Sequence, residues 1–244
     1  MTFDSYHWRG AVLGTPELER ARALVSSSQD RASFEQLLRS DDVAAVGIAL
    51  DQYRYGEATE RWGVASPFAQ YRDEVAARAR RVLREPPSPG SERALPGANH
   101  ASALNALANL IEPEDAGLVV SALAGTPTAD VRCAATAAAG YVLRNAADPD
   151  ERLTAALEKI VFDDALPSGE RIDALGSLAN ASAAVVTAIL LRVLELPDVK
   201  LQAHAALHLL DRDQGAHREV VQRVAHTWPA DPPYPADEVL DALA

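Results

Sequence analysis

The chain has 244 residues, of which 48% are hydrophobic and only 5% aromatic, and its formal net charge is −12. A core made mainly of Ala, Leu and Val favours packed helices over sheets, because Ala has the highest helix propensity and a low strand propensity. The single cysteine, Cys133, excludes an intramolecular disulfide and a multi-cysteine zinc site. Since it falls inside an expected helix, we expect a buried structural thiol.

The start of the chain is polar and includes Asp4, which is unlike a secretory signal. The longest apolar run, 183–191, is far shorter than the roughly 20 residues that span a membrane. We therefore expect a soluble, cytoplasmic protein. Residues 98–244 hold ten Arg and Lys against 21 Asp and Glu, whereas residues 1–97 are nearly neutral. The acidic half is expected to repel nucleic acid and anionic membranes.

Helix signals follow one another along the chain, separated by short Pro, Gly and Asp breaks. The predicted helices are 16–26, 30–39, 42–53, 66–84, 98–111, 114–124, 128–145, 149–162, 168–180, 182–195, 198–210, 215–227 and a short last one at 236–243. Residues 51–64 are expected to be irregular beyond the end of the third helix. The Pro-rich segment 85–97 is expected to be a loop inserted in one array, with a domain boundary as the alternative.

One short helix phrase recurs, with a basic residue or His followed three positions later by Ala. Its four clear copies start at His100, Arg132, Arg171 and Lys200, and Asp-Val precedes two of them, at 130–131 and 198–199. A weaker copy covers 42–50 and has Gly47 at the small position. A unit that recurs in this way predicts a stack of helix pairs, an architecture that mostly serves binding.

The copies start 32, 39 and 29 residues apart, and each spans two expected helices. With the Asp-Val-Arg and Asp-Val-Lys starts and the small-residue inner helices, this pattern resembles HEAT repeats. The resemblance covers about 98–227 well and 30–84 poorly. It implies an all-α, right-handed α-α superhelix of about five helix pairs, a single solenoid over 1–244. In it, 1–84 would form irregular N-terminal helices and a first repeat, and 228–244 a tail with a capping helix.

The first third of the chain holds a stretch rich in aromatic and arginine side chains, the types enriched in interface hot spots. Its candidate partner-binding residues are Tyr53, Arg54, Tyr55, Arg61 and Trp62, and Trp8, Phe68 and Tyr71 have the same character. The alternative is that these large side chains cap the end of the stack, as every solenoid requires.

Three further candidates lie around the helix at 98–111: His100, Asn105 and Asn109. Asn is a poor residue inside a helix because its side chain competes for backbone hydrogen bonds. In the related armadillo repeats, asparagines on the concave face hold the backbone of an extended peptide. The alternative is that these side chains bond to an adjacent loop, such as 85–97.

His204 and His208 are four residues apart on one helix face, which suits two metal ligands. No third ligand at a known spacing completes a site, so we expect structural histidines, no metal and no cofactor, and keep both as partner-binding candidates. The sequence contains no phosphate-binding Gly loop, nucleophile elbow or His-Glu-x-x-His.

Four arginines cluster towards the end of the helix at 66–84: Arg78, Arg80, Arg81 and Arg84. Arginine there stabilises the helix dipole, and Glu74 is spaced to pair with Arg78 on a solvated face. The alternative is a site for a phosphate or an acidic partner.

These observations favour a non-enzymatic scaffold or adaptor that binds a protein or peptide, possibly a basic one, on its concave face. A DNA-processing enzyme resembling the HEAT-like alkylpurine glycosylases is one alternative, although the acidic second half disfavours DNA. An inhibitor or immunity protein that masks a basic partner is the other.

Overall fold

A computed structural model of the chain describes residue 8 and residues 31–60, 63, 65–91, 94–124, 127–146 and 150–244. This part is all-α, with eleven α-helices and no strand apart from a single bridge between Ser91 and Ala94. Within it, no helix is both long enough and apolar enough to cross a bilayer. The chain divides into two compact units, Met1–Asn145 and Ala146–Ala244.

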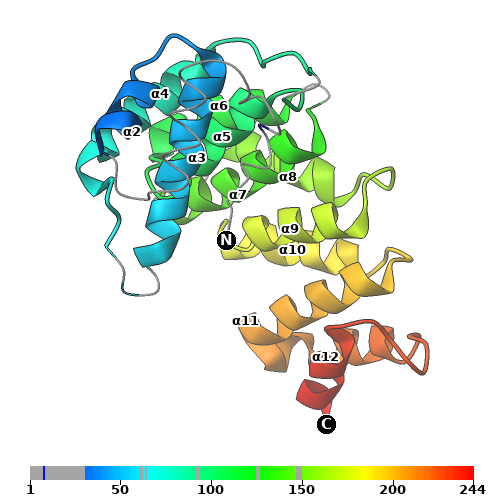
Figure 1. Cartoon of the computed structure of the whole chain (residues 1–244). Coiled ribbons are helices and arrows are strands. Elements are labelled where there is room, and N and C mark those ends of the chain that lie inside the picture. Colours follow the sequence, from blue (N-terminus) through cyan, green and yellow to red (C-terminus); the bar gives the residue numbers. More distant parts are fainter. Residues whose placement is uncertain are drawn as a thin grey trace. The chain divides into compact units, whose positions relative to one another are not determined.

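In the first unit, most helix contacts join elements that are consecutive or next but one along the chain. α5 packs against α3, α4 and α7, and α6 packs against α4 and α7 (Figure 1). The helices are α2 (Arg31–Leu38), α3 (Val43–Glu60), α4 (Arg72–Arg84), α5 (Ala98–Leu107), α6 (Ala116–Leu123) and α7 (Ala129–Asn145), with 3-10 turns η2 (Ala69–Tyr71) and η3 (Pro113–Asp115).

Small residues bring the helices of this unit close together. Ala103 on α5 and Ala135, Ala138 and Ala139 on α7 are all fully buried. A methyl side chain lets two helix backbones approach more closely than Leu would, and interiors are packed without space for larger groups. The recurring phrase therefore marks core positions at α5 and α7, as expected.

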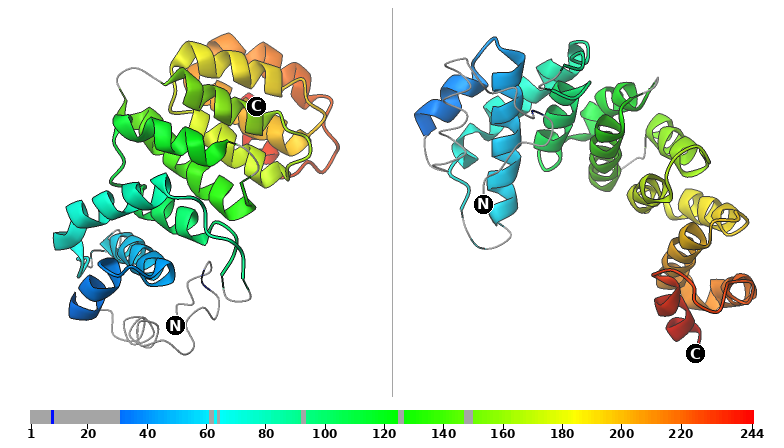
Figure 2. Two further views of the ribbon diagram at one scale, coloured as in Figure 1. Left: turned by 90° about the horizontal axis from the view of Figure 1, so that it is seen from above. Right: turned by 45° about the vertical axis from the view of Figure 1, so that its right-hand side comes forward.

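The second unit repeats this arrangement with five helices. They are α8 (Glu151–Val161), α9 (Ser168–Leu178), α10 (Ala183–Val193), α11 (Val199–Ala225) and α12 (Ala236–Leu243). They follow one another in chain order in Figure 2, and α11 contacts α9, α10 and α12.

The predicted break at 211–215 appears as a kink inside α11. Asp213 has the non-helical dihedrals φ −158° and ψ 91°. Its Oδ1 accepts a hydrogen bond of 3.0 Å from the backbone N–H of Ala216, which is how Asp caps the start of a helix. Two predicted helices, 198–210 and 215–227, are thus joined end to end.

Two expectations were wrong. Residues 51–60 continue α3 as a regular helix, because burial of Asp51, Gln52 and Tyr53 overrides the poor helix propensity of the aromatic residues. Cys133 is exposed, because it lies on the face of α7 opposite its buried alanines. The predicted helix at 16–26 lies outside the described residues.

The Pro-rich segment lies within the first unit and is tied to α5. Asn99 accepts a hydrogen bond from the backbone N–H of Ser88 at 2.8 Å and donates one to the carbonyl of Pro86 at 3.2 Å. Gly97 precedes α5 with φ +75°, a conformation that favours glycine. The hydrogen bonds of Asn99 therefore hold the Pro-rich segment against α5, and Gly97 makes the turn into that helix.

Candidate functional site

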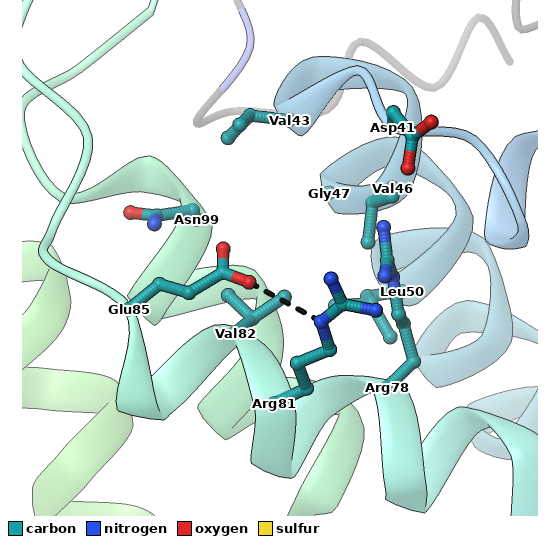
Figure 3. A pocket seen from close by; sticks show the side chains of 10 residues that line it. All are labelled: Asp41, Val43, Val46, Gly47, Leu50, Arg78, Arg81, Val82, Glu85 and Asn99. Carbon is teal, nitrogen blue, oxygen red and sulfur yellow. Dashed lines mark ion pairs between the residues drawn. The ribbon is translucent and has the colours of Figure 1, made fainter.

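A cavity of about 70 Å³ lies between α3 and α4 (Figure 3). A water needs roughly 10–15 Å³ on this measure, so the cavity has room for a small polar group. Its apolar lining comes from Val46 and Leu50 of α3 and Val82 of α4, and Val43 at the start of α3 is 46% exposed. Its polar lining consists of Asp41, Arg78, Arg81, Glu85 and Asn99.

Arg78 is the part-buried cation of this cavity. Its Nη2 donates a hydrogen bond of 2.5 Å to the carbonyl of Ser40, just before α3. Its Nε is buried and has no hydrogen-bond partner. A buried donor without a partner is unfavourable by about 1–3 kcal/mol. The protein therefore leaves part of the hydrogen-bonding capacity of this guanidinium unused.

The helix pairing predicted for Arg78 does not form. Glu74 accepts instead from Arg39, whose Nε lies 2.6 Å from Glu74 Oε1 and whose Nη2 lies 3.1 Å from Oε2. Arg39 also pairs with Glu35 one turn earlier on the chain. Glu74 is thus used to join α4 to the end of α2, which explains why Arg78 lacks the carboxylate that its spacing predicts.

Arg80, two residues further along α4, shows the opposite situation. Its Nε and Nη2 donate to the two carboxylate oxygens of Asp115 at 2.8 and 2.9 Å, and Nη2 also reaches Glu112 at 3.0 Å. The hydrogen bonds to Asp115 raise the pKa of Arg80. This arginine holds α4 to η3 and has a structural role.

Arg81 lies at the rim of the cavity with a partner of its own. Its Nε is 3.4 Å from Glu85 Oε1, and both side chains are largely exposed (Figure 3). An exposed pair of this kind contributes little to stability but balances the local charge. Glu85 therefore offsets Arg81, while Asp41 is the second carboxylate that lines the cavity.

Trp8 packs on the helix that forms one wall of the cavity. Its indole is 3% exposed, and Nε1 donates a hydrogen bond of 3.0 Å to Ser102 Oγ on α5. A Cβ added to Gly47 would lie only 2.1 Å from the ring. Gly47 is thus needed for the indole to approach α3, a relationship between distant segments that the sequence pattern does not indicate.

The aromatic and arginine candidates differ in how deeply the structure buries them. Tyr53 is buried, Tyr55 is 42% exposed, and Arg54 is intermediate with a buried Nη1 that has no hydrogen-bond partner. Arg61 and Trp62 lie outside the described residues.

Two neighbouring aromatic candidates, Phe68 and Tyr71, contact residues of α2. Phe68 stacks on Phe34 with ring centroids 4.1 Å apart, and the Tyr71 hydroxyl donates to Glu35 at 3.3 Å. These contacts favour the capping interpretation for this pair.

The candidates on and after α5 contact different parts of the chain. His100 Nε2 is 2.8 Å from the carbonyl of Glu85, so this side chain contacts the Pro-rich segment. Asn109 is exposed and donates to Glu57 Oε2 on α3 at 3.2 Å. Asn105 is half-buried between them along the helix. The bond of His100 to the 85–97 segment fits the structural alternative.

His204 and His208 lie on α11 in the second unit and are half-buried. Burial lowers the pKa of both, and the charges of His208 and Lys200 lower the pKa of His204 further. Burial, followed by the charge of Glu170, raises the pKa of Asp173 on α9, against an opposite effect of His204. In the part of the chain that the structure describes, no group of three His, Cys, Asp or Glu side chains is placed to hold a metal ion.

Comparison of the chain with protein-family models, with curated proteins and with solved structures gives no match.

Proposed function

We propose that the chain is a non-enzymatic protein- or peptide-binding module, built as a HEAT-like α-solenoid. The order of helix contacts inside each unit supports the solenoid, because the main contacts join helices that are neighbours or next neighbours along the chain. The small buried residues of α5 and α7 support it too, since repeats of this kind need close backbone approach.

The observation that carries the binding function is the cavity between α3 and α4. It combines apolar side chains of α3 and α4, an exposed Val43 at its edge and the part-buried guanidinium of Arg78. Binding sites combine apolar surface with placed polar groups, and in this cavity the charged side chains of both signs are prominent. A peptide lying across α3 and α4 would cover Val43 and place one side chain in the cavity.

Selection of peptides from a random display library on the full chain tests this function, followed by fluorescence anisotropy of the enriched peptides. Val43→Trp should obstruct the edge of the cavity and weaken binding at least about tenfold, a loss of about 1.4 kcal/mol. Val185→Trp is the matched control, because Val185 on α10 is 43% exposed and belongs to the other unit. No enriched peptide, or peptides that bind both variants equally, would overturn the proposal.

A basic partner is the second candidate, and the charge of the second unit favours it. Residues 146–244 contain 17 Asp and Glu but only eight Arg and Lys. Complementary charge speeds association and makes it sensitive to salt. A short oligolysine peptide should bind at low salt and dissociate as salt rises, whereas equal binding at both salt concentrations, or none, would contradict this candidate.

A further inference from the structure

We infer that α3 and α5 form a socket for an indole side chain, which Trp8 occupies as an internal ligand until a tryptophan of the partner peptide replaces it. The exchange rests on the proposed binding function, whereas the socket itself is tested without any partner. The contacts of Trp8 and the position of the socket beside the cavity between α3 and α4 support this assignment.

The socket is shaped by a residue of α3 that has no side chain. A Cβ added to Gly47 would lie 2.1 Å from Cζ2, 2.4 Å from Cε2 and 2.7 Å from Nε1 of the Trp8 ring. The ring therefore fills the space that the side chain of any larger residue would need. Trp8 is only 3% exposed, so the protein encloses it almost completely, as a formed site encloses a ligand.

A single polar group fixes the orientation of the indole in the socket. Ser102 Oγ on α5 accepts a hydrogen bond of 3.0 Å from Trp8 Nε1, and Ser102 is fully buried. The next copy of the recurring phrase has Ala134 at this position, which offers no side-chain acceptor. In the last copy the same position is Gln202, which accepts from Trp228 Nε1 at 2.8 Å. An apolar enclosure with one placed acceptor is thus how this chain holds an indole group.

The two tryptophans differ in what lies beside them. Trp228 follows α11 and bonds to a residue 26 positions earlier at the start of the same helix. Trp8 bonds to Ser102 across 94 residues, and its socket borders the cavity. Gly47 and Asn99, one turn before Ser102 on α5, both line that cavity. Because Gly47 places no side chain between the two spaces, withdrawal of Trp8 would join the socket to the proposed peptide site.

A tryptophan of the partner is the side chain that fits this combined site. It brings the ring that lies on Gly47 and the N–H that Ser102 accepts, and tryptophan is enriched among the residues that contribute most to interfaces. Trp8 competes with it at the millimolar effective concentration that a tethered group reaches. The partner must therefore add further contacts, such as cover for the exposed Val43, in order to replace Trp8.

Chemical rescue of Trp8→Ala by indole tests the socket in the full chain. Cavities left by a large apolar side chain bind small aromatic molecules. Indole should therefore raise the thermal midpoint of the variant in a saturable way, with a dissociation constant on the order of 0.1–1 mM for so small a ligand. If the variant does not fold alone, indole should restore its helical circular dichroism. A variant that indole neither stabilises nor refolds overturns the inference.

Two companion measurements check the chemistry of the socket. N-methylindole has no N–H, so it should bind about two- to tenfold more weakly than indole, and Ser102→Ala should remove this difference. Gly47→Ala, added to Trp8→Ala, should abolish the effect of indole because its methyl group takes the place of the ring, whereas Gly176→Ala should not. Equal binding of the two ligands, or equal effects of the two glycine variants, would contradict the socket.

Fluorine nuclear magnetic resonance of the original chain, labelled with fluorotryptophan, tests the exchange. Trp8→Phe assigns the Trp8 signal by its loss. Peptides selected on the original chain should contain tryptophan, should bind Trp8→Ala at least about tenfold more tightly, and at saturation should move the Trp8 signal to the position of an exposed ring. The Trp228 signal should stay in place because its bond to Gln202 is not involved. A Trp8 signal that saturation leaves unchanged overturns the exchange.

The binding function and the socket fail in different ways. Peptides that bind at Val43 without a tryptophan, and leave the Trp8 signal in place, would leave the binding function standing and end this inference. A selection that yields no peptide would overturn the binding function and the exchange with it. Absence of rescue by indole would overturn the socket alone.

Discussion

Arg171 on α9 and Asp198, the residue that caps α11, are bonded to each other across two copies of the recurring helix phrase. Arg171 Nη1 lies 3.5 Å from Asp198 Oδ2, and Arg171 Nε donates to the carbonyl of Val161 at 2.9 Å. Asp198 also accepts from Ser168 Oγ at 2.6 Å and from the backbone N–H of Leu201 at 3.1 Å. The first residue of one copy is thus fixed by the Asp that precedes the next.

Asp198→Ala should lower the free energy of unfolding of the second unit by about 2–4 kcal/mol. It removes a helix cap and leaves the buried Arg171 without its carboxylate, two losses that add. Urea unfolding followed by circular dichroism measures the change.

Asp150→Ala is the control for this loss. Asp150 caps α8 in the same unit, but its partner Arg152 is exposed, so the change should be nearer 1 kcal/mol. Equal losses for the two variants would mean that the bond between the copies contributes nothing beyond the cap.

Gly47→Ala should displace Trp8 from α3. The added methyl would lie 2.1 Å from the indole, so the ring must move, and overpacking of this kind typically lowers stability by about 1–3 kcal/mol. Gly176→Ala is the matched control, because Gly176 lies inside α9 and an added Cβ meets no atom within 4 Å. That control should stabilise its helix by about 0.5–1 kcal/mol.

Tryptophan fluorescence and thermal unfolding measure both effects of the Gly47 variant. A red-shifted emission with a lower midpoint is expected for Gly47→Ala, and the shift should be absent when Trp8 is also replaced by Phe. An unchanged emission spectrum in Gly47→Ala would show that the contact is dispensable.

The sequence predicts local features of this fold well and long-range partners poorly. The helix predicted at 168–180, which is α9 (Ser168–Leu178), and the start of α11 after Asp198 follow from local signals that act within one turn. The helical state of 51–60 does not, because it depends on the burial of Tyr53, which local signals do not encode. The site shows the same limit, since the spacing of Glu74 and Arg78 predicts a pair, but Arg39 takes Glu74. Which carboxylate pairs with which arginine is decided by tertiary contacts.

Ala139→Leu tests whether the recurring phrase marks close helix packing. Ala139 is fully buried on α7, so three added carbon atoms have no space and should lower stability by about 1–3 kcal/mol. Ala137→Leu places the same side chain on the exposed face of α7 and should change stability by less than about 0.5 kcal/mol. Equal midpoints in urea for the two variants would refute close packing at Ala139.

The second unit should lose stability as the pH falls below about 6.5, the ordinary pKa of histidine. His204 and His208 have a folded pKa below that value, mainly because burial disfavours the charged ring. The unfolded chain therefore takes up protons first, so this contribution to stability is fully present above about 6.5 and is lost as the pH falls through the folded pKa values.

The groups around the two histidines are Lys200, Asp211 and Arg212 on α11, Asp173 on α9 and Glu238 on α12. Asp173 has a raised pKa, so its own contribution is present below about 3.9 and is lost as the pH rises through its folded pKa. The contribution of Asp173 to stability therefore decreases as the pH rises, whereas that of the histidines decreases as the pH falls. It also begins to change at a lower pH, so the two effects can be measured separately.

Thermal unfolding between about pH 5 and 7 measures the dependence. The double variant His204→Gln and His208→Gln should flatten the curve, because glutamine does not titrate. A double variant with the same slope as the original chain would assign the pH dependence to other groups and remove the buried histidines as its cause.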